Sequence, residues 1–102
     1  MLKVIIKYPG EPVGSEAEIS DDLKVMQTIV GGYIEVVAIN DDDMLICNDA
    51  GKLVGLRHNF NTPRDEIVGP VIIVGTHGDA FADVSLSLDA WETLLREWGN
   101  DV

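Results

Sequence analysis

The stretch Gln27 to Ile39, QTIVGGYIEVVAI, changes its pattern once, at the two glycines in its middle. Before the glycines, apolar residues recur at helical spacing from Leu23 to Val30. After them, the side chains alternate with a period of two, which is typical of a strand. Gly31 can adopt the left-handed backbone that ends a helix. We therefore predict a helix, a glycine stop, and a strand from Tyr33 to Ile39 that is covered on much of both faces.

Both predicted helices have recognisable ends. Ser20 or Asp21 can cap the first helix, with Asp22 in its first turn, where the helix dipole favours negative charge. Ser87 can cap the second helix, and Gly99 can stop it. This second helix has one apolar stripe and an i, i+4 pair of Glu92 and Arg96 on its other face. Its stripe consists of Leu88, Trp91, Leu94, Leu95 and Trp98.

The other apolar runs predict strands. Leu2 to Tyr8 alternates as a strand with one core face, whereas the uninterrupted run Val71 to Val74 predicts a strand buried on both faces. Two more strands are predicted at Met44 to Asn48, after a hairpin turn at Asn40 to Asp43, and at Lys52 to Leu56.

Together these elements predict an α+β fold in a single domain, residues 1–102. We expect a mostly antiparallel sheet of four to five strands with two helices packed on one face, because two apolar helical stripes need a surface that buries them. A parallel pairing of the first two strands across the first helix is the alternative.

Composition bounds the function. Hydrophobic residues make up 46% of the chain, but no apolar run approaches the ~20 residues of a membrane span, so we expect no membrane association. The single cysteine fits a reducing, cytoplasmic compartment. Eighteen acidic residues against seven basic ones give a net charge of −11, which disfavours direct nucleic-acid binding. The acidity has three interpretations: solubility, a salty cytoplasm, or docking on a basic partner.

The polar stretch Arg57 to Glu66 gathers two arginines, a histidine and two asparagines in a chain that is poor in cations. We predict an exposed loop there, with an exposed phenylalanine, since loops on a rigid sheet often carry function. The candidate residues for binding a ligand or a partner are Arg57, His58, Asn59, Phe60 and Arg64. An ordinary connection is the alternative.

The other reactive residues form no recognised motif. His58 and His77 have no metal-ligand spacing, and the run Asp41 to Asp43 lacks the alternation of a calcium loop, so we expect a solvated turn and no metal site. Cys47 lies within an apolar strand, where a small buried side chain is the simpler interpretation than a nucleophile. We predict no catalytic residue and no cofactor.

Several segments in their order resemble an uncharacterised family, a small domain of unknown function from bacteria, phages and other mobile elements. The resemblance spans residues 2 to 98 and rests on LKVIIKYPG, IVGGYIEVV, LICNDAGKLVGL with Asn59, and IVGPVIIVG. Members often look like G-x-L-x-G-L-P-x-N-R, which Gly51 to Leu56 and Asn59 match. Arg57 stands at the proline position and Phe60 at the arginine position. The resemblance implies that the gene belongs to a mobile element, but it does not indicate any particular activity.

We therefore predict a non-enzymatic binding or interaction module of a phage, plasmid or other mobile element. Its partner is expected to be a protein with a basic surface, and a homodimer is an alternative. Three other functions remain open: an acidic mimic of nucleic acid that inhibits a host DNA-binding protein, a structural subunit, and a small hydrolase.

Overall fold

The computed structural model describes every residue from Met1 to Val102. Its elements, in chain order, are β1 (Leu2–Lys7), β2 (Ser15–Ile19), α1 (Leu23–Val30), β3 (Ile34–Ala38), β4 (Asp43–Asn48), β5 (His58–Asn61), β6 (Glu66–Val68), β7 (Val71–His77), β8 (Ala80–Ala82) and α2 (Leu88–Glu97). Neither helix is long and apolar enough to span a bilayer.

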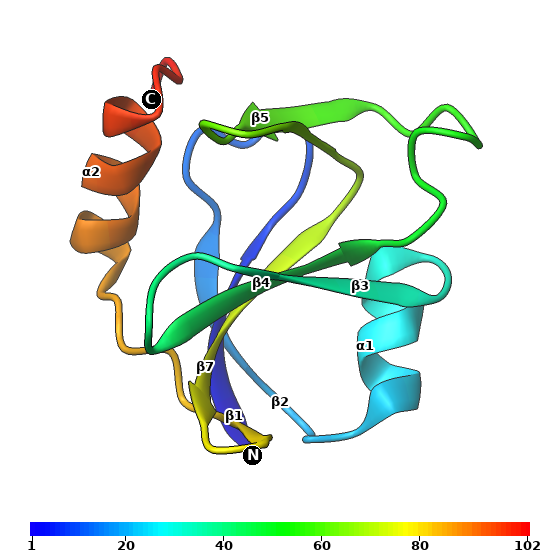
Figure 1. Cartoon of the computed structure of the whole chain (residues 1–102), viewed down its shortest axis with the longest axis vertical. Helices are drawn as coiled ribbons and strands as arrows, with labels where there is room; N and C mark the ends of the chain where they lie inside the picture. The colour runs from blue at the N-terminus through cyan, green and yellow to red at the C-terminus, as the bar shows by residue number, and fades with distance from the viewer.

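The strands form a central antiparallel sheet in the order β2-β1-β7-β4-β3, and β8 extends it as a sixth strand by pairing with β7. A separate hairpin of β5 and β6 lies beside this sheet (Figure 1). Every strand pair is antiparallel, so the predicted α+β class with a mostly antiparallel sheet is confirmed. The alternative parallel pairing of the first two strands is wrong, because β2 returns directly alongside β1 before the helix begins.

The two helices lie on opposite faces of the sheet, which corrects the prediction that both pack on one face (Figure 1). The cause is β7, whose run Val71 to Val74 is fully buried. Successive residues of a strand point to opposite faces, so this run needs cover on both sides. Ile73 packs in the cluster that contains Trp91 of α2, and Ile72 packs in the cluster that contains Met26 of α1.

The same two layers correct the prediction for the first strand. Val4 belongs to the α1 cluster and Ile5 to the α2 cluster, so β1 is buried on both faces rather than one. Lys7 at its end is only 3% exposed. The lysine at position 7, in the alternating pattern of β1, therefore does not indicate that this face of the strand is open to solvent.

The helix α1 ends as predicted but begins with a different cap. Its cap is Asp22, whose side chain accepts a hydrogen bond from the Lys24 N–H at 2.7 Å. At the other end Gly31 has φ 84°, the left-handed conformation expected of a glycine stop. For α2, Ser87 is the cap as predicted, and Arg96 bonds to Glu92 one turn earlier.

Two strand predictions are wrong: one strand is less buried than expected, and the other does not form. β3 is an edge strand that pairs only with β4, and Val36 is 41% exposed, so it is not covered on both faces. Lys52 to Leu56 is a series of turns and not a strand: the Val54 N–H bonds to the Ala50 carbonyl, and the Leu56 N–H bonds to the Gly51 carbonyl. These backbone groups form their hydrogen bonds within the turns, so they are not available to pair with a neighbouring strand.

The predicted turn at Asn40 to Asp43 is present, but Asp43 is fully buried and not solvated. Its carboxylate accepts hydrogen bonds from the Ser85 N–H at 2.8 Å, from the Ser85 hydroxyl, and from the Asn40 amide at 3.1 Å. The carboxylate thereby connects the β3–β4 hairpin to the segment that leads into α2.

Candidate functional site

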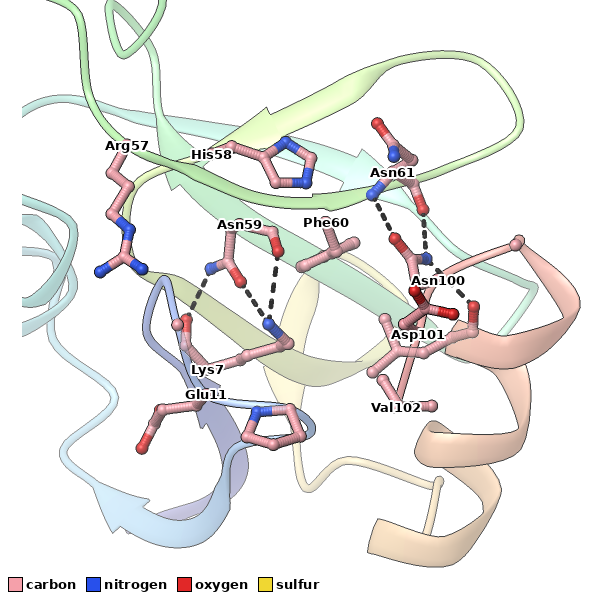
Figure 2. A pocket seen from close by; sticks show the side chains of 14 residues that line it. Lys7, Glu11, Arg57, His58, Asn59, Phe60, Asn61, Asn100, Asp101 and Val102 are labelled. Atoms are coloured by element: carbon pink, nitrogen blue, oxygen red, sulfur yellow. Dashed lines mark hydrogen bonds between the residues drawn. The ribbon is translucent and has the colours of Figure 1, made fainter.

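A pocket of about 570 Å³ lies where β1 ends, beside β5 and beside the residues that follow α2 (Figure 2). Polar side chains dominate its lining, and only three of its fourteen lining residues are hydrophobic. Four of the five predicted site residues line it, namely Arg57, His58, Asn59 and Phe60. Arg64 does not, because it lies in the β5–β6 loop and lines a different pocket.

Lys7 is the buried cation of this pocket. Its Nζ donates a hydrogen bond of 2.6 Å to the Asn59 side-chain oxygen and lies 3.4 Å from the Asn59 carbonyl oxygen. It also lies 5.6 Å from the centre of the Phe60 ring, within the range of a cation–π contact. Lys7 forms no ion pair with a carboxylate. Burial lowers the pKa of Lys7, and the nearby Glu11 carboxylate opposes this shift.

Asn59 holds Lys7 in place through a β-bulge. The β5–β6 register shifts between His58 and Phe60, so Asn59 is an extra residue that breaks the alternation of the strand. As a result, Asn59 and Phe60 are both buried, although they are neighbours in the chain. The Asn59 amide donates to the carbonyl oxygens of Lys7 and Gly69, each at 2.8 Å. One side chain thus links β1, β5 and the connection between β6 and β7.

Phe60 is buried rather than exposed, which corrects the prediction of a loop at Arg57 to Glu66. Its ring lies edge-on to Trp91, with centroids 5.5 Å apart, and stacks on Trp98 at 6.3 Å. Trp91 in turn donates its ring N–H to the Val13 carbonyl at 3.0 Å. Phe60 is therefore part of the core that supports the pocket, and it also lines the pocket.

Arg57 is the exposed cation of the pocket. Its guanidinium has neither an ion pair nor a side-chain hydrogen bond within the chain. It lies against Gly10, where a Cβ atom would be 3.1 Å from a guanidinium nitrogen, and Gly10 has φ 93°. A glycine leaves room for the guanidinium there. Figure 2 shows that the side chains of Asn59 in β5 and of Arg57 just before it extend toward the segment of Lys7 and Glu11.

His58 and two asparagines complete the rim. The Nδ1 atom of His58 lies 2.6 Å from a Glu66 carboxylate oxygen, and both side chains are about half exposed. At the other end of the pocket, Asn100 accepts a hydrogen bond from the Asn61 N–H and donates to the Asn61 carbonyl, both at 2.8 Å. This pair of hydrogen bonds fixes the end of α2 to β5 (Figure 2).

The other reactive residues lie apart from this pocket. Cys47 is buried in β4, and its thiol lies 3.7 Å from a Glu35 carboxylate oxygen. Burial, followed by the charge of Glu35, raises the pKa of Cys47 to about 12. A thiol of this kind is a poor nucleophile, since the thiolate is the reactive form. Neither histidine lines the pocket beside Cys47, and His77 is exposed at the end of β7.

Sequence reasoning missed Lys7, Glu11 and Asn100 as parts of the site. Lys7 and Glu11 flank a Pro-Gly turn about fifty residues before the predicted loop, and no local pattern connects the two segments. One signal was available: Ile5 stands between Lys3 and Lys7, which is unusual for a strand face that is open to solvent.

No curated protein and no solved structure is detectably similar to this chain. The model of one family matches residues 2–97, which is nearly the whole sequence. That family is described as a domain of unknown function, DUF3846, in agreement with the resemblance in the sequence segments. The chain therefore belongs to the DUF3846 family of domains of unknown function.

Proposed function

We propose that this protein is a non-enzymatic binding module that holds the carboxylate or phosphate group of a small anionic ligand between Lys7 and Arg57. The observation that carries the proposal is a pair of cations that form no ion pair in a pocket that the Glu11 and Asp101 carboxylates also line. In a chain with a net charge of −11, two of the seven basic residues line one pocket, and neither is paired with a carboxylate.

The energetics favour an anion at this place. A buried ammonium loses much of its hydration, and a nearby negative charge offsets that loss. The guanidinium of Arg57 can supply two parallel N–H donors to a carboxylate or phosphate. Lys7 is held in place by the Asn59 side chain, so little entropy is lost at this cation when the ligand binds, whereas the exposed Arg57 side chain must still be ordered.

Binding is better supported than catalysis. Lys7 is 3% exposed, with its amine enclosed by Asn59 and Phe60, so it attracts an anion bound at the exposed Arg57 through its charge and is not placed to attack a substrate carbon. The Cys47 thiol is buried outside the pocket with a raised pKa. A general acid or base must reach the reacting group directly or through one water.

The test uses sodium phosphate and sodium succinate as probes, each titrated at constant ionic strength with sodium chloride as the balance. We expect one or both probes to shift the backbone amide signals of Arg57 to Asn61 in ¹H–¹⁵N NMR spectra. The two probes distinguish a phosphate site from a carboxylate site. If neither probe shifts these signals, the proposed function is wrong.

Two matched variants give the control. Arg57→Gln and Arg64→Gln each remove one exposed arginine, but only Arg57 lines this pocket. We expect Arg57→Gln to weaken probe binding about tenfold or more, the equivalent of ~1.4 kcal/mol, and Arg64→Gln to leave it unchanged. Equal effects of the two variants would mean that net charge alone attracts the probe.

We further propose that the module serves a phage, plasmid or other mobile element in the cytoplasm of its host. This setting rests on the family resemblance of the sequence. The genes beside the coding gene test it, since a run of chromosomal housekeeping genes in most genomes that carry the family would contradict it.

A further inference from the structure

We propose that the free edge of β3 binds an extended, basic segment of a partner protein, which adds a strand to the central sheet. This inference goes beyond the anion pocket and uses none of its residues. It rests on three features of the β3 side of the molecule: its unpaired backbone groups, a groove beside them, and the charge around that groove.

The unpaired groups follow from the register of β3 on β4. The Ile39 N–H bonds to the Asp43 carbonyl, and the Asp49 N–H bonds to the Tyr33 carbonyl, so residues 33 and 39 direct their backbone groups toward β4. In an antiparallel pair this direction alternates from residue to residue. Ile34, Val36 and Ala38 therefore direct their N–H and C=O groups away from β4, to the outside of the sheet.

This edge lacks the features that usually block strand addition, such as lysine, proline or inward-pointing charge. Its sequence is IEVVA, with one charged residue. The opposite edge strand, β2, has the sequence SEAEI, with two glutamates. Lys3 is paired with Glu18, but its backbone groups bond to Asp83 and Val84 on the side away from β2. The backbone groups of Glu18, and of Glu16 two residues earlier, therefore face outward from the β2 edge. Of the strands at the two ends of the order β2-β1-β7-β4-β3, β3 therefore has the less charged edge.

A groove of about 680 Å³ runs beside β3 on the α2 side of the sheet. Val37 of β3 and Ile39 just after it line the groove, together with Ile67 of β6 and the partly buried Trp98, the C-cap of α2. The loop from Thr62 to Asp65 forms its other wall. Alternate side chains of an added strand would enter this groove, as in other proteins that bind peptides by strand addition.

The charge around the groove selects the occupant. This groove and the adjoining pocket beside Cys47 are lined by five carboxylates and two cations, which are Glu35, Asp41, Asp49, Asp65, Glu66, Lys52 and Arg64. Lys52 is bonded to Asp65 and Glu66 lies against His58, which leaves three carboxylates, Glu35, Asp41 and Asp49, and one arginine without such a partner. A second copy of this chain would bring its own −11 charge to the same place, whereas a segment with lysine or arginine would be attracted.

The experiment uses a synthetic peptide, acetyl-Lys-Val-Lys-Val-Lys-Val-Lys-amide, which can present either its valines or its lysines to the groove. We expect it to shift the amide signals of Ile34, Val36 and Ala38 in ¹H–¹⁵N NMR spectra and to slow their hydrogen exchange. Affinity should fall as sodium chloride rises, because the attraction is screened. A peptide with glutamate in place of lysine should not bind.

Two variants place the peptide on the edge. Val36→Pro removes an outward N–H, and Val36→Lys adds a like charge next to the peptide, so each should weaken binding about tenfold or more. Glu16→Pro makes the matched change on the β2 edge and should leave binding intact. Arg57→Gln should also leave it intact, which separates this test from that of the anion pocket.

Three results would overturn the inference. The first is a lysine peptide that does not shift the β3 amides, and the second is binding that survives both changes at Val36. The third is a dimer of the protein in sedimentation experiments that Val36→Pro converts to monomer, because a second copy of the chain would then be the occupant of the edge.

Discussion

Asn59 satisfies three buried polar groups with one side chain: the Lys7 amine and the carbonyl oxygens of Lys7 and Gly69. Truncation by Asn59→Ala would leave all three without that partner, and each unsatisfied buried group costs about 1–3 kcal/mol. We expect a loss of about 3 kcal/mol or more in the free energy of unfolding, measured by urea denaturation.

The neighbouring Asn61 provides the control for this prediction. Its side chain is exposed, and its bonds to Asn100 use backbone atoms that survive truncation. Asn61→Ala should change the free energy of unfolding by no more than about 0.5 kcal/mol. A similar loss in both variants would show that the bonds of Asn59 contribute nothing special.

Lys7 gives the stability of the fold a defined pH dependence. Its folded pKa lies below the ordinary value of 10.5 because of burial. As the pH rises from the folded pKa to 10.5, the unfolded chain keeps a proton that the folded chain has released, so the free energy of unfolding rises. Lys7→Met should remove this rise. The stability of the wild type relative to Lys7→Met should therefore increase as the pH rises from the lowered folded pKa of Lys7 toward 10.5.

Cys47 acts in the opposite direction. Its pKa is raised from 9.0 to about 12, so above pH 9 the unfolded chain loses a proton that the folded chain keeps, and stability falls as the pH rises toward 12. This contribution is present in both the wild type and Lys7→Met, and it cancels in their difference. Urea denaturation at several pH values measures both curves. A constant difference between them would contradict the role assigned to Lys7.

The burial of Cys47 also predicts its reactivity. The thiol is 5% exposed and mostly protonated, whereas a disulfide reagent attacks the accessible thiolate. We expect the native protein to react with Ellman's reagent at least about 100-fold more slowly than the protein in urea, at the same pH. Rapid reaction of the native protein would show that β4 opens readily, and it would revive the nucleophile interpretation.

Residue patterns predicted burial well only where the local period continues without interruption. Trp91, Leu95, Met26 and Val30 are buried, as the helical spacing requires. The prediction for Phe60 is wrong because a bulge puts two consecutive residues on the inside, and a bulge has no signature in the period. Arg57 and His58 do line the pocket, but its buried cation comes from a strand fifty residues earlier.

At the scale of elements, Gly75 determines how β7 and β8 pack. A Cβ atom at this position would lie 2.0 Å from the Asp83 carbonyl oxygen, which is far inside van der Waals contact. Gly75→Ala should therefore force the segment after β8 away from the sheet and cost at least about 2 kcal/mol in the free energy of unfolding. Thermal and urea denaturation measure the loss.

Gly78, in the turn between the same strands, is the matched control. It has φ 61°, and a Cβ atom added there would have no neighbouring atom within 4 Å, so Gly78→Ala meets only the left-handed backbone penalty of about 1–2 kcal/mol. If Gly75→Ala costs less than Gly78→Ala, the close approach of Asp83 does not limit this position.

Element prediction succeeded for the helices and failed for the connections between strands. Helix α1 spans Leu23–Val30 and α2 spans Leu88–Glu97, close to the bounds that the apolar spacing and the glycine stops predicted, although the cap of α1 is Asp22 and not Ser20 or Asp21. The turns at Lys52 to Leu56 carry apolar residues that stay exposed, with Leu53 at 92%, so their composition imitates a strand. The faces covered by each helix depend on chain topology, which a single amphipathic stripe does not encode.

At the scale of the whole molecule, the net charge of −11 is spread over a particle of 30 × 30 × 21 Å. At about 0.01 M salt the Debye length is ~30 Å, so carboxylates repel one another across the entire protein, whereas at 0.1 M it is ~10 Å. Only three ion pairs offset this repulsion, and one of them involves His58. Folding brings these charges together, so screening should favour the folded state.

We therefore expect the melting temperature to rise when sodium chloride increases from about 0.01 to 0.1 M and to level off above that range, because the Debye length is then shorter than most charge separations. The double variant Asp41→Asn, Asp42→Asn removes two exposed charges and should show a smaller rise. A rise that continues into molar salt would favour adaptation to a salty cytoplasm. A melting temperature that falls with salt would mean that the ion pairs stabilise the fold more than the repulsion destabilises it. The acidic surface could then not be explained as unpaired charge that is available to a basic partner.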